Sequence, residues 1–584
     1  MDNHIPDISD KGLHGRAFAP YPSRRSVVHS TNGIVSCTQP LAAQAGLRIL
    51  QAGGNAADAV IAVASCLNVT EPTSTGIGGD AFCLFYNAST KKIHGLNASG
   101  RSPAALTLER ALADIPAAER SQDRIPMTHV HSVTVPGAAS AWCDTVERFG
   151  SGKFTLREVL ADAIRLAEDG YPVSEVTATN WALGVERLVG ASPNSGEMLI
   201  DGRAPREGEV IRLSNLAKVY RELGEKGRKG FYEGWIAEAL VEVLKSRGGV
   251  MELEDLKKMG EVGSEETEAV GLVYERTGLK LWEHAPNGQG IVALMALGIL
   301  ESLQERGVVP DIGKEGSHAH NSAEYLHAII ESLKIAFADG HWFIADPAHS
   351  KVPTEGLLDK EYLAARSKLF DPSVATKTPA HGSPALRSSD TVYFTVVDGQ
   401  GNAASFINSN YAGFGSAIIP KGCGFTLQNR GSGFSLSAGH PNVLAPSKRP
   451  YHTIIPALIT DAKTGELHTA FGVMGGYMQP QGHVQVFLNT CVWGMSVQQA
   501  LDAPRICVGG GYDPSHPLVQ IEEGISEETV EKLRNLGHNV VVVTGWSRGV
   551  FGRGQVIRVK HCPDGKRILS AGSDLRGDGH AVGY

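Results

Sequence analysis

The chain has 584 residues, of which 42% are hydrophobic and 20% charged, and its formal net charge is −8 at pH 7. This composition is typical of a globular protein and excludes a mainly disordered chain. Because the net charge is negative, the chain has no overall positive potential that would attract nucleic acid or an anionic membrane surface. We expect neither as a partner.

The N-terminal residues lack the basic and apolar segments of a secretory signal. The best candidate for a membrane span, residues 56–69, is interrupted by Asp58 and Asn68 and is too short. The eight cysteines are scattered and form no CxxC pair, which argues against a zinc site and against a disulfide scaffold. We therefore expect a cytoplasmic protein with no signal peptide and no transmembrane segment.

The first part of the chain predicts a lead-in followed by two helices. Residues 1–30 are polar and rich in Pro and Arg, and we expect a loose segment there. Residues 39–69 predict two helices, because apolar residues recur with helical spacing on both sides of Gly53 and Gly54. Asn55 is placed to cap the second helix.

Three further segments have recognisable local patterns. Residues 74–80 form a glycine-rich turn before a strand at 81–86. The order of turn and strand, and the absence of GxxxxGK[ST] spacing, argue against a phosphate-binding loop. Residues 324–338 have helical periodicity and predict a buried helix.

A predicted linker leads directly into a β-hairpin. Residues 348–390 are rich in Pro, Ser, Lys and Gly, and residues 376–390 within them are typical of an exposed tail or linker. From Thr391 the pattern changes: residues 391–398 alternate β-branched and aromatic side chains, residues 398–402 form a turn, and residues 403–409 form a second strand. This order places a threonine hydroxyl at the end of a sheet, beside a peptide bond that could be cut.

Motifs spread over most of the chain resemble those of the gamma-glutamyltranspeptidase family of N-terminal-nucleophile hydrolases. The resemblance covers residues 33–584, and its strength lies in the order of the motifs rather than in any one of them. The motifs are GGNAADAV at 53–60, STGIGGDAF at 74–82, VPGAASAW at 135–142, DTVYFTVVD at 390–398, GFGS at 413–416, PSKRPYHTIIP at 446–456, GVMGGYMQPQGH at 472–483, DAPR at 502–505, FGRGQ at 551–555 and SDLRGDGHAVGY at 573–584.

The resemblance implies an α+β fold, specifically a four-layer αββα sandwich, and a precursor that cleaves itself. It places the cut between Asp390 and Thr391. The products would be a large subunit, residues 31–390, and a small catalytic subunit, residues 391–584. These two subunits from one precursor would be each other's partners.

The resemblance also assigns catalytic roles. Thr391 would be the nucleophile, and its freed α-amino group would be the general base, because an unperturbed α-amine has a pKa near neutrality. Ser409 would hydrogen-bond the nucleophile. Gly475 and Gly476 would direct backbone N–H groups at the oxyanion. From the residues alone, a β-propensity threonine, a polar strand serine and an ordinary tight turn remain alternatives.

The expected substrate-binding residues depart from the family pattern. The family's carboxylate-binding arginine falls at Ser99, so Arg101 is a candidate replacement, with an ordinary surface arginine as the alternative. Tyr411, Arg430 and Gly433 take the positions that bind the substrate α-amino group in the family, yet they supply no negative charge. Arg430 could instead bind a carboxylate, as in a glutaryl or oxamyl group.

The family's paired serines are replaced by His452 and Thr453. His452 could tune the site electrostatically, or it could be a structural hydrogen-bonding residue. We expect no metal and no cofactor, since His318, His320 and His327 lack the spacing of metal ligands and the chemistry needs none.

Three functions follow in order of preference. The first is a self-processing γ-glutamyltransferase or glutathione hydrolase that cleaves γ-glutamyl amide bonds of glutathione or its conjugates through a threonine acyl-enzyme. The second keeps the mechanism but acts on ω-carboxy acyl amides, such as glutaryl or oxamate-like compounds. The third is a non-catalytic relative with a structural or partner-binding role. The substrate in the first two cases is a small molecule.

Overall fold

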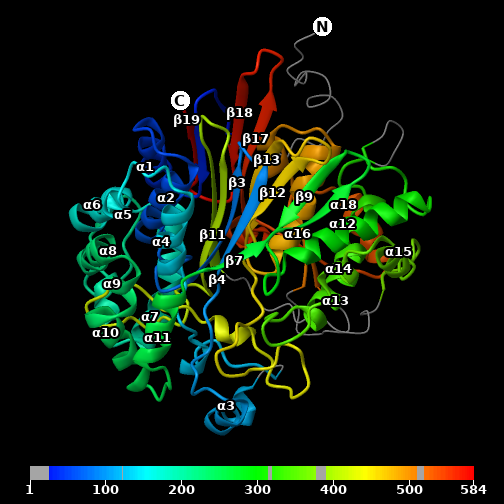
Figure 1. Cartoon of the computed structure of the whole chain (residues 1–584). Coiled ribbons are helices and arrows are strands. Elements are labelled where there is room, and N and C mark those ends of the chain that lie inside the picture. The colour runs from blue at the N-terminus through cyan, green and yellow to red at the C-terminus, as the bar shows by residue number, and fades with distance from the viewer. Residues whose placement is uncertain (1–24, 121–122, 314–318, 377–389, 510–517) are drawn as a thin grey trace.

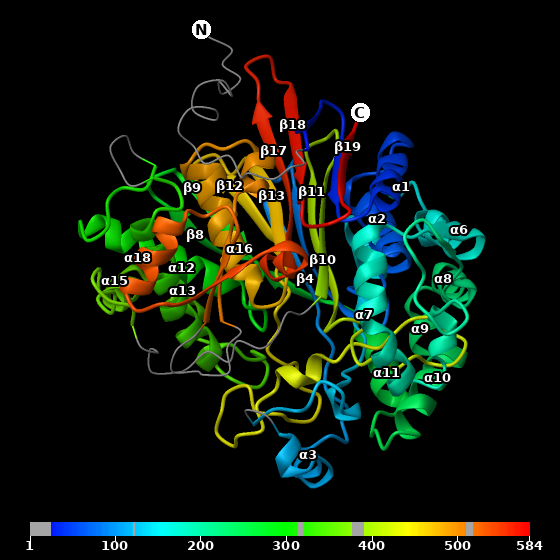
Figure 2. The ribbon, with the colours of Figure 1, turned by 180° about the vertical axis from the view of Figure 1, so that it is seen from behind.

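The computed structural model describes residues 25–120, 123–313, 319–376, 390–509 and 518–584. Two seven-stranded antiparallel sheets lie face to face, and helices cover the outer face of each (Figure 1). Seen from behind, the same four layers follow each other from side to side (Figure 2). The predicted four-layer αββα sandwich is confirmed.

Each sheet draws strands from distant parts of the chain. Sheet A contains β1 (Val28–Ser30), β18 (Arg567–Ser573), β17 (Arg553–His561), β13 (Leu467–Met474), β12 (Ala457–Asp461), β9 (Leu279–Glu283) and β8 (Val270–Tyr274), in that order. Sheet B contains β19 (His580–Gly583), β2 (Ile34–Cys37), β10 (Asp390–Val397), β11 (Ala403–Tyr411), β3 (Asp80–Asn87), β4 (Lys92–Ala98) and β7 (Glu265–Glu268).

Helices from the first half of the chain lie outside sheet B. They are α1 (Pro40–Gln51), α2 (Ala56–Thr70), α4 (Ala138–Phe149), α5 (Leu156–Val159), α6 (Ala161–Asp169), α7 (Glu175–Ala191), α8 (Ser214–Lys226), α9 (Arg228–Tyr232), α10 (Gly234–Lys245) and α11 (Leu253–Val262). Helix α3 (Leu108–Asp114) lies at the base of the molecule (Figure 1).

The second helical layer lies outside sheet A. It contains α12 (Gly290–Glu305), α13 (Ala323–Phe343), α14 (Thr354–Leu357), α15 (Lys360–Ser367), α16 (Met478–Phe487), α17 (Val497–Asp502) and α18 (Glu527–Asn535). Two small sheets complete the fold, one of β14 (Ile506–Val508), β15 (Leu518–Glu522) and β16 (Asn539–Val543), and one of β5 (Tyr171–Pro172) and β6 (Val210–Ile211).

The two helices predicted for residues 39–69 are α1 and α2. Asn55 accepts hydrogen bonds from the N–H groups of Ala57 and Asp58, and the Asp58 side chain accepts from the Asn55 N–H, which completes a capping box. Every residue of α2 is buried, since the helix is enclosed by neighbouring helices and by sheet B. The helix predicted for residues 324–338 is α13, which is longer by a few residues at its C-terminal end.

The hairpin predicted at Thr391 is formed by β10 and β11, the central strands of sheet B. All described β10 side chains, residues 391–397, are buried, and so is every residue of β11. This continuous burial follows from the layering, because one face of the sheet packs on helices and the other on sheet A. The β10 residues from Thr391 onward thus lie inside the sandwich.

Two predicted loose segments fall mainly outside the described residues. Residues 1–24 of the expected lead-in and residues 377–389 of the expected linker belong to the parts that are not described. Within the lead-in, Val28–Ser30 forms edge strand β1, which pairs with β18. No helix in the described ranges combines the length and the apolar character that a membrane crossing requires.

Candidate active site

Thr391 lies at a bulge in the β10–β11 ladder. Asp390 pairs with Tyr411 and Val392 pairs with Asn408, so Thr391 faces two residues of β11 instead of one. The bulge brings the Thr391 hydroxyl to 3.0 Å from the hydroxyl of Ser409, and both side chains are buried. The structure therefore brings together the nucleophile and the neighbour that the sequence predicted.

Ser409 is fixed by two further donors. The N–H of Tyr411 donates to the Ser409 hydroxyl at 2.9 Å, and Nη2 of Arg430 donates to it at 3.3 Å. Because an N–H group has no acceptor capacity, the serine oxygen is the acceptor in both bonds. One hydroxyl thus links Thr391 to a candidate substrate-binding arginine.

The glycine-rich turn at residues 74–80 packs directly under this pair. A Cβ atom at Gly79 would lie 2.4 Å from the carbonyl oxygen of Ser409, and one at Gly78 would lie 2.4 Å from that of Thr426. No side chain fits at such distances, so glycine is required for close backbone approach. The turn supports the strand that carries Ser409, which agrees with the argument against a phosphate loop.

Gly475 and Gly476 form the turn after β13, with φ angles of +128° and +60°. Strand β13 packs face to face on β10, with Gly472 against the ring of Tyr393, and its last residue brings the turn to the end of the sandwich where Thr391 lies. In the described part of the chain, the N–H of neither Gly475 nor Gly476 donates to a protein acceptor. The two adjacent N–H groups of this turn are therefore available to a ligand.

Gln289, which the sequence reasoning missed, fixes this turn. Its Nε2 donates to the carbonyl oxygens of Gly476 at 2.8 Å and Thr453 at 2.7 Å, and its Oε1 accepts from the hydroxyl of Tyr451 at 2.9 Å. Gln289 immediately precedes α12, far in sequence from the other residues. Gln289 is recognised as part of the site only by its contacts with residues distant in sequence, so no local sequence pattern could have identified it.

Arg430 is a buried cation between Tyr411 and Thr453. The guanidinium carbon lies 4.2 Å from the centre of the Tyr411 ring, and Nη1 donates to the Thr453 hydroxyl at 2.6 Å. Burial lowers the pKa of Arg430 to about 10, which leaves it charged at neutral pH. Within the described residues no carboxylate forms an ion pair with Arg430, and its Nε has no hydrogen-bond partner.

Tyr411 has an unusual backbone conformation, with φ of +79°. A bulky residue in this region is strained by contacts between its side chain and the backbone, and such strain is typical of functional sites. The conformation places the tyrosine ring over Arg430 while its N–H reaches Ser409. Tyr411, Arg430 and Thr453, three of the departures from the family pattern, thus form one contiguous group.

A second arginine lies in the same region. Nη1 of Arg124 donates to the hydroxyl of Tyr477 at 3.4 Å, and Tyr477 directly follows the Gly475–Gly476 turn. Arg124 is held by a β-bridge with Ser435, and no ion pair joins it to a carboxylate in the part of the chain that the structure describes. Burial raises the pKa of Tyr411, and the positive charges of Arg124 and Arg430 oppose this rise.

The comparisons with known proteins agree with this geometry. The family model described as gamma-glutamyltranspeptidase matches residues 42–584. The chain belongs to this family. A glutathione hydrolase-like YwrD proenzyme of Bacillus subtilis is 35% identical over 96% of this chain and 99% of its own length. An oxamate amidohydrolase proenzyme of Klebsiella pneumoniae is 33% identical over 95% and 99%.

The solved structures include a cephalosporin acylase from Bacillus halodurans, which is 40% identical over 97% of this chain and 98% of that chain, with a TM-score of 0.84. Family membership makes this protein an enzyme of the class that hydrolyses or transfers acyl groups at amide bonds. The choice of acyl group differs between these relatives, so it must be argued from the residues of the site.

His452 differs from the family's serine and forms a buried pair with Asp80. Its Nε2 lies 3.0 Å from Oδ2 of Asp80, whose Oδ1 accepts the N–H groups of Gly100 and Gly137. Burial and the nearby Arg430 hold the pKa of His452 well below its usual value, while burial raises the pKa of Asp80 to about 7. Both pKa shifts favour a neutral His452. Its contacts are those of a residue that holds neighbouring groups in position.

Arg101 lies apart from this group. Its Nη1 is 3.2 Å from Oδ2 of Asp346 and 3.2 Å from the carbonyl oxygen of Ser447, and Nη2 is 3.8 Å from Glu265. No hydrogen bond or ion pair joins Arg101 to Ser409 or Arg430 among the described residues. Its role as a substrate ligand stays a prediction.

One histidine from the sequence analysis belongs to a buried cluster. Nδ1 of His327 lies 2.7 Å from Nε2 of His538, and Glu331 lies near both. Nζ of Lys334 lies 2.8 Å from Oε1 of Glu331 and 3.4 Å from Nδ1 of His538, so the lysine already supplies the positive charge that the carboxylate requires. We assign no metal to this group.

Proposed function

We propose that the protein is a self-processing amidohydrolase whose nucleophile is Thr391. In the precursor the Thr391 hydroxyl attacks the carbonyl carbon of Asp390, the peptide C–N bond breaks, and an ester forms. The α-amino group of Thr391 is free once the C–N bond has broken. Water then hydrolyses the ester, which restores the Thr391 hydroxyl and leaves Asp390 with a free carboxyl group. The 3.0 Å contact with Ser409 and the bulge at Thr391 support this assignment.

In turnover, the freed amine takes the hydroxyl proton of Thr391 while the oxygen attacks the substrate carbonyl. The N–H groups of Gly475 and Gly476 stabilise the oxyanion, and one such donor contributes roughly 2.7–4 kcal/mol to the transition state. The amide C–N bond then breaks, the amine leaves with the proton, and water releases the acyl group from the threonine ester.

We propose that the acyl group carries a carboxylate at its far end. The supporting observation is the pair of arginines, Arg430 and Arg124, for which the described residues provide no carboxylate partner. Burial lowers the pKa of Arg430, and the buried carboxyl group of Asp80 opposes this but forms no ion pair with Arg430 among the described residues; a bound carboxylate would supply that direct partner. The cationic α-amino group of a γ-glutamyl substrate would meet two like charges and only hydroxyl acceptors from Tyr411 and Tyr477.

A γ-glutamyl substrate, our first expectation from the sequence, remains the second candidate. It is favoured by the 35% identity with a protein named as glutathione hydrolase-like over nearly the whole chain. Glutaryl and γ-glutamyl anilides separate the candidates, because they differ only in the α-amino group. We expect a higher kcat/KM for the glutaryl compound. Because both compounds carry the terminal carboxylate, a clear preference for the γ-glutamyl compound would show that the site binds the α-amino group and would reverse the order of the two candidates.

The non-catalytic alternative is tested on the purified protein before any substrate is added. We expect two fragments on a denaturing gel, the smaller beginning with the sequence TVYFTV. Active protein recovered by mass spectrometry with residues 390 and 391 still joined would refute the proposed nucleophile. An uncut, inactive 584-residue chain would favour the structural role.

A further inference from the structure

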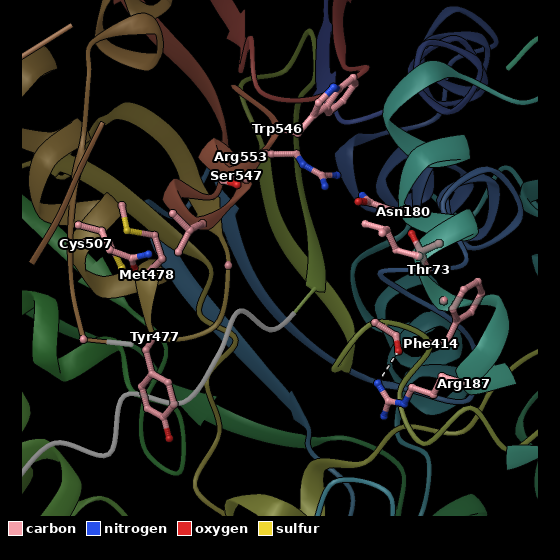
Figure 3. Close-up of a pocket in the computed structure, with 18 of the residues that line it drawn as sticks. Thr73, Asn180, Arg187, Phe414, Tyr477, Met478, Cys507, Trp546, Ser547 and Arg553 are labelled. Atoms are coloured by element: carbon pink, nitrogen blue, oxygen red, sulfur yellow. Dashed lines mark hydrogen bonds between the residues drawn. The ribbon is translucent and has the colours of Figure 1, made fainter. Parts of the chain in front are cut away.

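A cavity of about 570 Å³ opens beside the Gly475–Gly476 turn. Its walls come from α7, from the segment after β11, from the turn and from the residues between β16 and β17. Figure 3 shows Met478 and Cys507 on one side, with Thr73, Asn180 and Phe414 on the other. This volume lies within the range of sites that enclose a small organic molecule.

The turn separates this cavity from the group of arginines. Gly475 and Tyr477 line the cavity, whereas Tyr411, Arg430, His452 and Thr453 do not. The ring of Tyr477 points away from the other labelled residues (Figure 3), and its hydroxyl accepts from Arg124. A substrate carbonyl held by the turn would therefore have its acyl chain on the arginine side and its nitrogen substituent on the cavity side.

Part of the cavity wall is apolar surface that is exposed to water. Trp546 is 63% exposed and Leu183 is 80% exposed, although both are large apolar side chains, and both line this cavity. Trp546 belongs to η7 (Gly545–Phe551) and Leu183 to α7. Exposed apolar residues that converge on one cavity mark a ligand surface more strongly than scattered ones do.

The charges of the cavity restrict the ligand further. Two guanidinium groups, Arg187 and Arg553, line the cavity, and no carboxylate is among the described lining residues. Arg553 pairs with buried Glu71, while Arg187 donates to the carbonyl oxygen of Gly413 at 3.0 Å. The cavity therefore disfavours a cationic group.

The part of the cavity wall that α7 forms is fixed by close packing. A Cβ atom at Gly184 would lie 2.6 Å from the ring of Phe414, so glycine lets that ring pack closely on the helix. Trp181 meets the same ring edge-on, with 5.9 Å between centroids. These contacts fix the position of Leu183, which lies on the same helix.

We infer that this cavity is the subsite for the amine half of the substrate, and that it selects an amine with a bulky aromatic or fused-ring body and no positive charge. The inference rests on the proposed function, since the turn must hold the scissile carbonyl. When the C–N bond breaks, the amine takes the proton held by the Thr391 α-amine and departs through the cavity. Large amines then gain contact with Trp546 that ammonia cannot make.

The test compares two substrates that share the glutaryl group, one releasing 2-naphthylamine and one releasing ammonia. Trp546→Ala should lower kcat/KM for the naphthylamide about tenfold, because ring stacking and apolar burial are lost, and should leave the primary amide within about twofold. Leu183→Ala should act in the same direction. Trp235→Ala is the matched control, since that tryptophan is partly exposed on α10 and does not line the cavity.

Equal effects of Trp546→Ala on both substrates, or no effect on the naphthylamide, would overturn the subsite. If the wild-type protein cleaves neither substrate, the proposed acyl group is wrong, and the subsite is then judged by binding alone. Calorimetry with 2-naphthylamine should show saturable binding that Trp546→Ala weakens and Trp235→Ala does not. Binding that is absent, or independent of Trp546, would refute the inference.

Discussion

The two sides of the Gly475–Gly476 turn differ in burial and in chemistry. On the arginine side, Arg430 and Thr453 are almost fully buried and joined by a hydrogen bond. On the cavity side, Trp546 and Leu183 are largely exposed, and apolar side chains share the lining with Arg187 and Arg553. Directional bonds in a buried site discriminate between groups far more sharply than apolar contact in an open one does. We therefore expect strict selection of the acyl group and broad tolerance of the amine.

The largest effect should come from removing Thr391, the proposed nucleophile. Thr391→Ala should leave one uncut chain and lower turnover at least about a thousandfold, since neither the ester nor the acyl-enzyme can form. A denaturing gel and a rate assay with the glutaryl anilide measure both outcomes.

Thr395→Val is the matched control for this change. Thr395 is a buried threonine of the same strand, and its hydroxyl donates to the carbonyl oxygen of Ala404 rather than to Ser409. This variant should still cleave itself and turn over substrate. If the Thr391→Ala chain is still cut normally, Thr391 is not the nucleophile. The two sides of the turn would then have no identified reacting group between them.

The arginine side is tested next. Arg430→Met should lower kcat/KM for the glutaryl anilide about a hundredfold, because a charge-assisted bond is worth roughly 1.5–3 kcal/mol. Arg124→Met should cost about tenfold, since Arg124 is less deeply buried. Because Arg430 is a buried charge without a carboxylate partner in the described chain, its Met variant should unfold at an equal or higher temperature than the wild type.

Arg101→Met separates substrate binding from general loss of charge. Its ion pair with Asp346 lies outside the arginine group, so we expect little change in kcat/KM. A fall equal to that of Arg430→Met would place Arg101 in the pocket after all. Unchanged kinetics in Arg430→Met would show that the carboxylate is bound elsewhere.

The sequence predicted the parts of this site that have local signatures. The hairpin from Thr391, the glycine turn after β13 and the Asn55 cap all depend on neighbours within a few residues, and all are confirmed as structure. The position of Ser409 beside Thr391 followed from the family resemblance. The fold class followed in the same way, because motifs in a fixed order identify an architecture that no single element determines.

The residues that were missed are defined by contacts between distant segments. Gln289 precedes α12, and Arg124 lies in an irregular segment bridged to Ser435. Neither has a periodicity or spacing that distinguishes it from an ordinary polar residue. The pairing of His452 with Asp80 crosses 372 positions and was likewise invisible in the sequence.

A substitution of Gln289 tests whether the arginine side and the cavity side both depend on the Gly475–Gly476 turn. Gln289→Leu would leave the buried carbonyl oxygens of Gly476 and Thr453 without this donor, at a cost of roughly 1–3 kcal/mol each in stability. Because the turn loses its support, kcat should fall about tenfold for the naphthylamide and the primary amide alike, with a smaller change in KM.

The control is Gln304→Leu, at the other end of α12. Gln304 is also buried and accepts from the hydroxyl of Tyr274. Its loss should lower the unfolding temperature without changing kcat. A Gln289→Leu protein that loses stability but keeps its kcat would show that the turn does not need this glutamine to hold the oxyanion.

The smallest effect concerns the Asp80–His452 pair, and it is read from stability rather than rate. Burial raises the folded pKa of Asp80 to about 7, above its ordinary value of 3.8, so between these pH values the folded state binds the proton more tightly than the unfolded state does. This group therefore contributes stability at low pH that is lost as pH rises from about 4 to about 7. The lowered pKa of His452 acts in the opposite direction, because only the unfolded state gains that proton as pH falls.

Asp80→Asn isolates the aspartate contribution, because the amide does not titrate and its oxygen can still accept the N–H groups of Gly100 and Gly137. The stability of the wild type relative to this variant, measured by denaturant titration, should decrease from pH 4 to pH 7 and level off above. A difference that instead increases over this range would mean that the pair is ionised, with a charged histidine beside Arg430. The two charges of such a pair would cancel, so the net positive charge that selects an anionic acyl group would still come from Arg430 and Arg124.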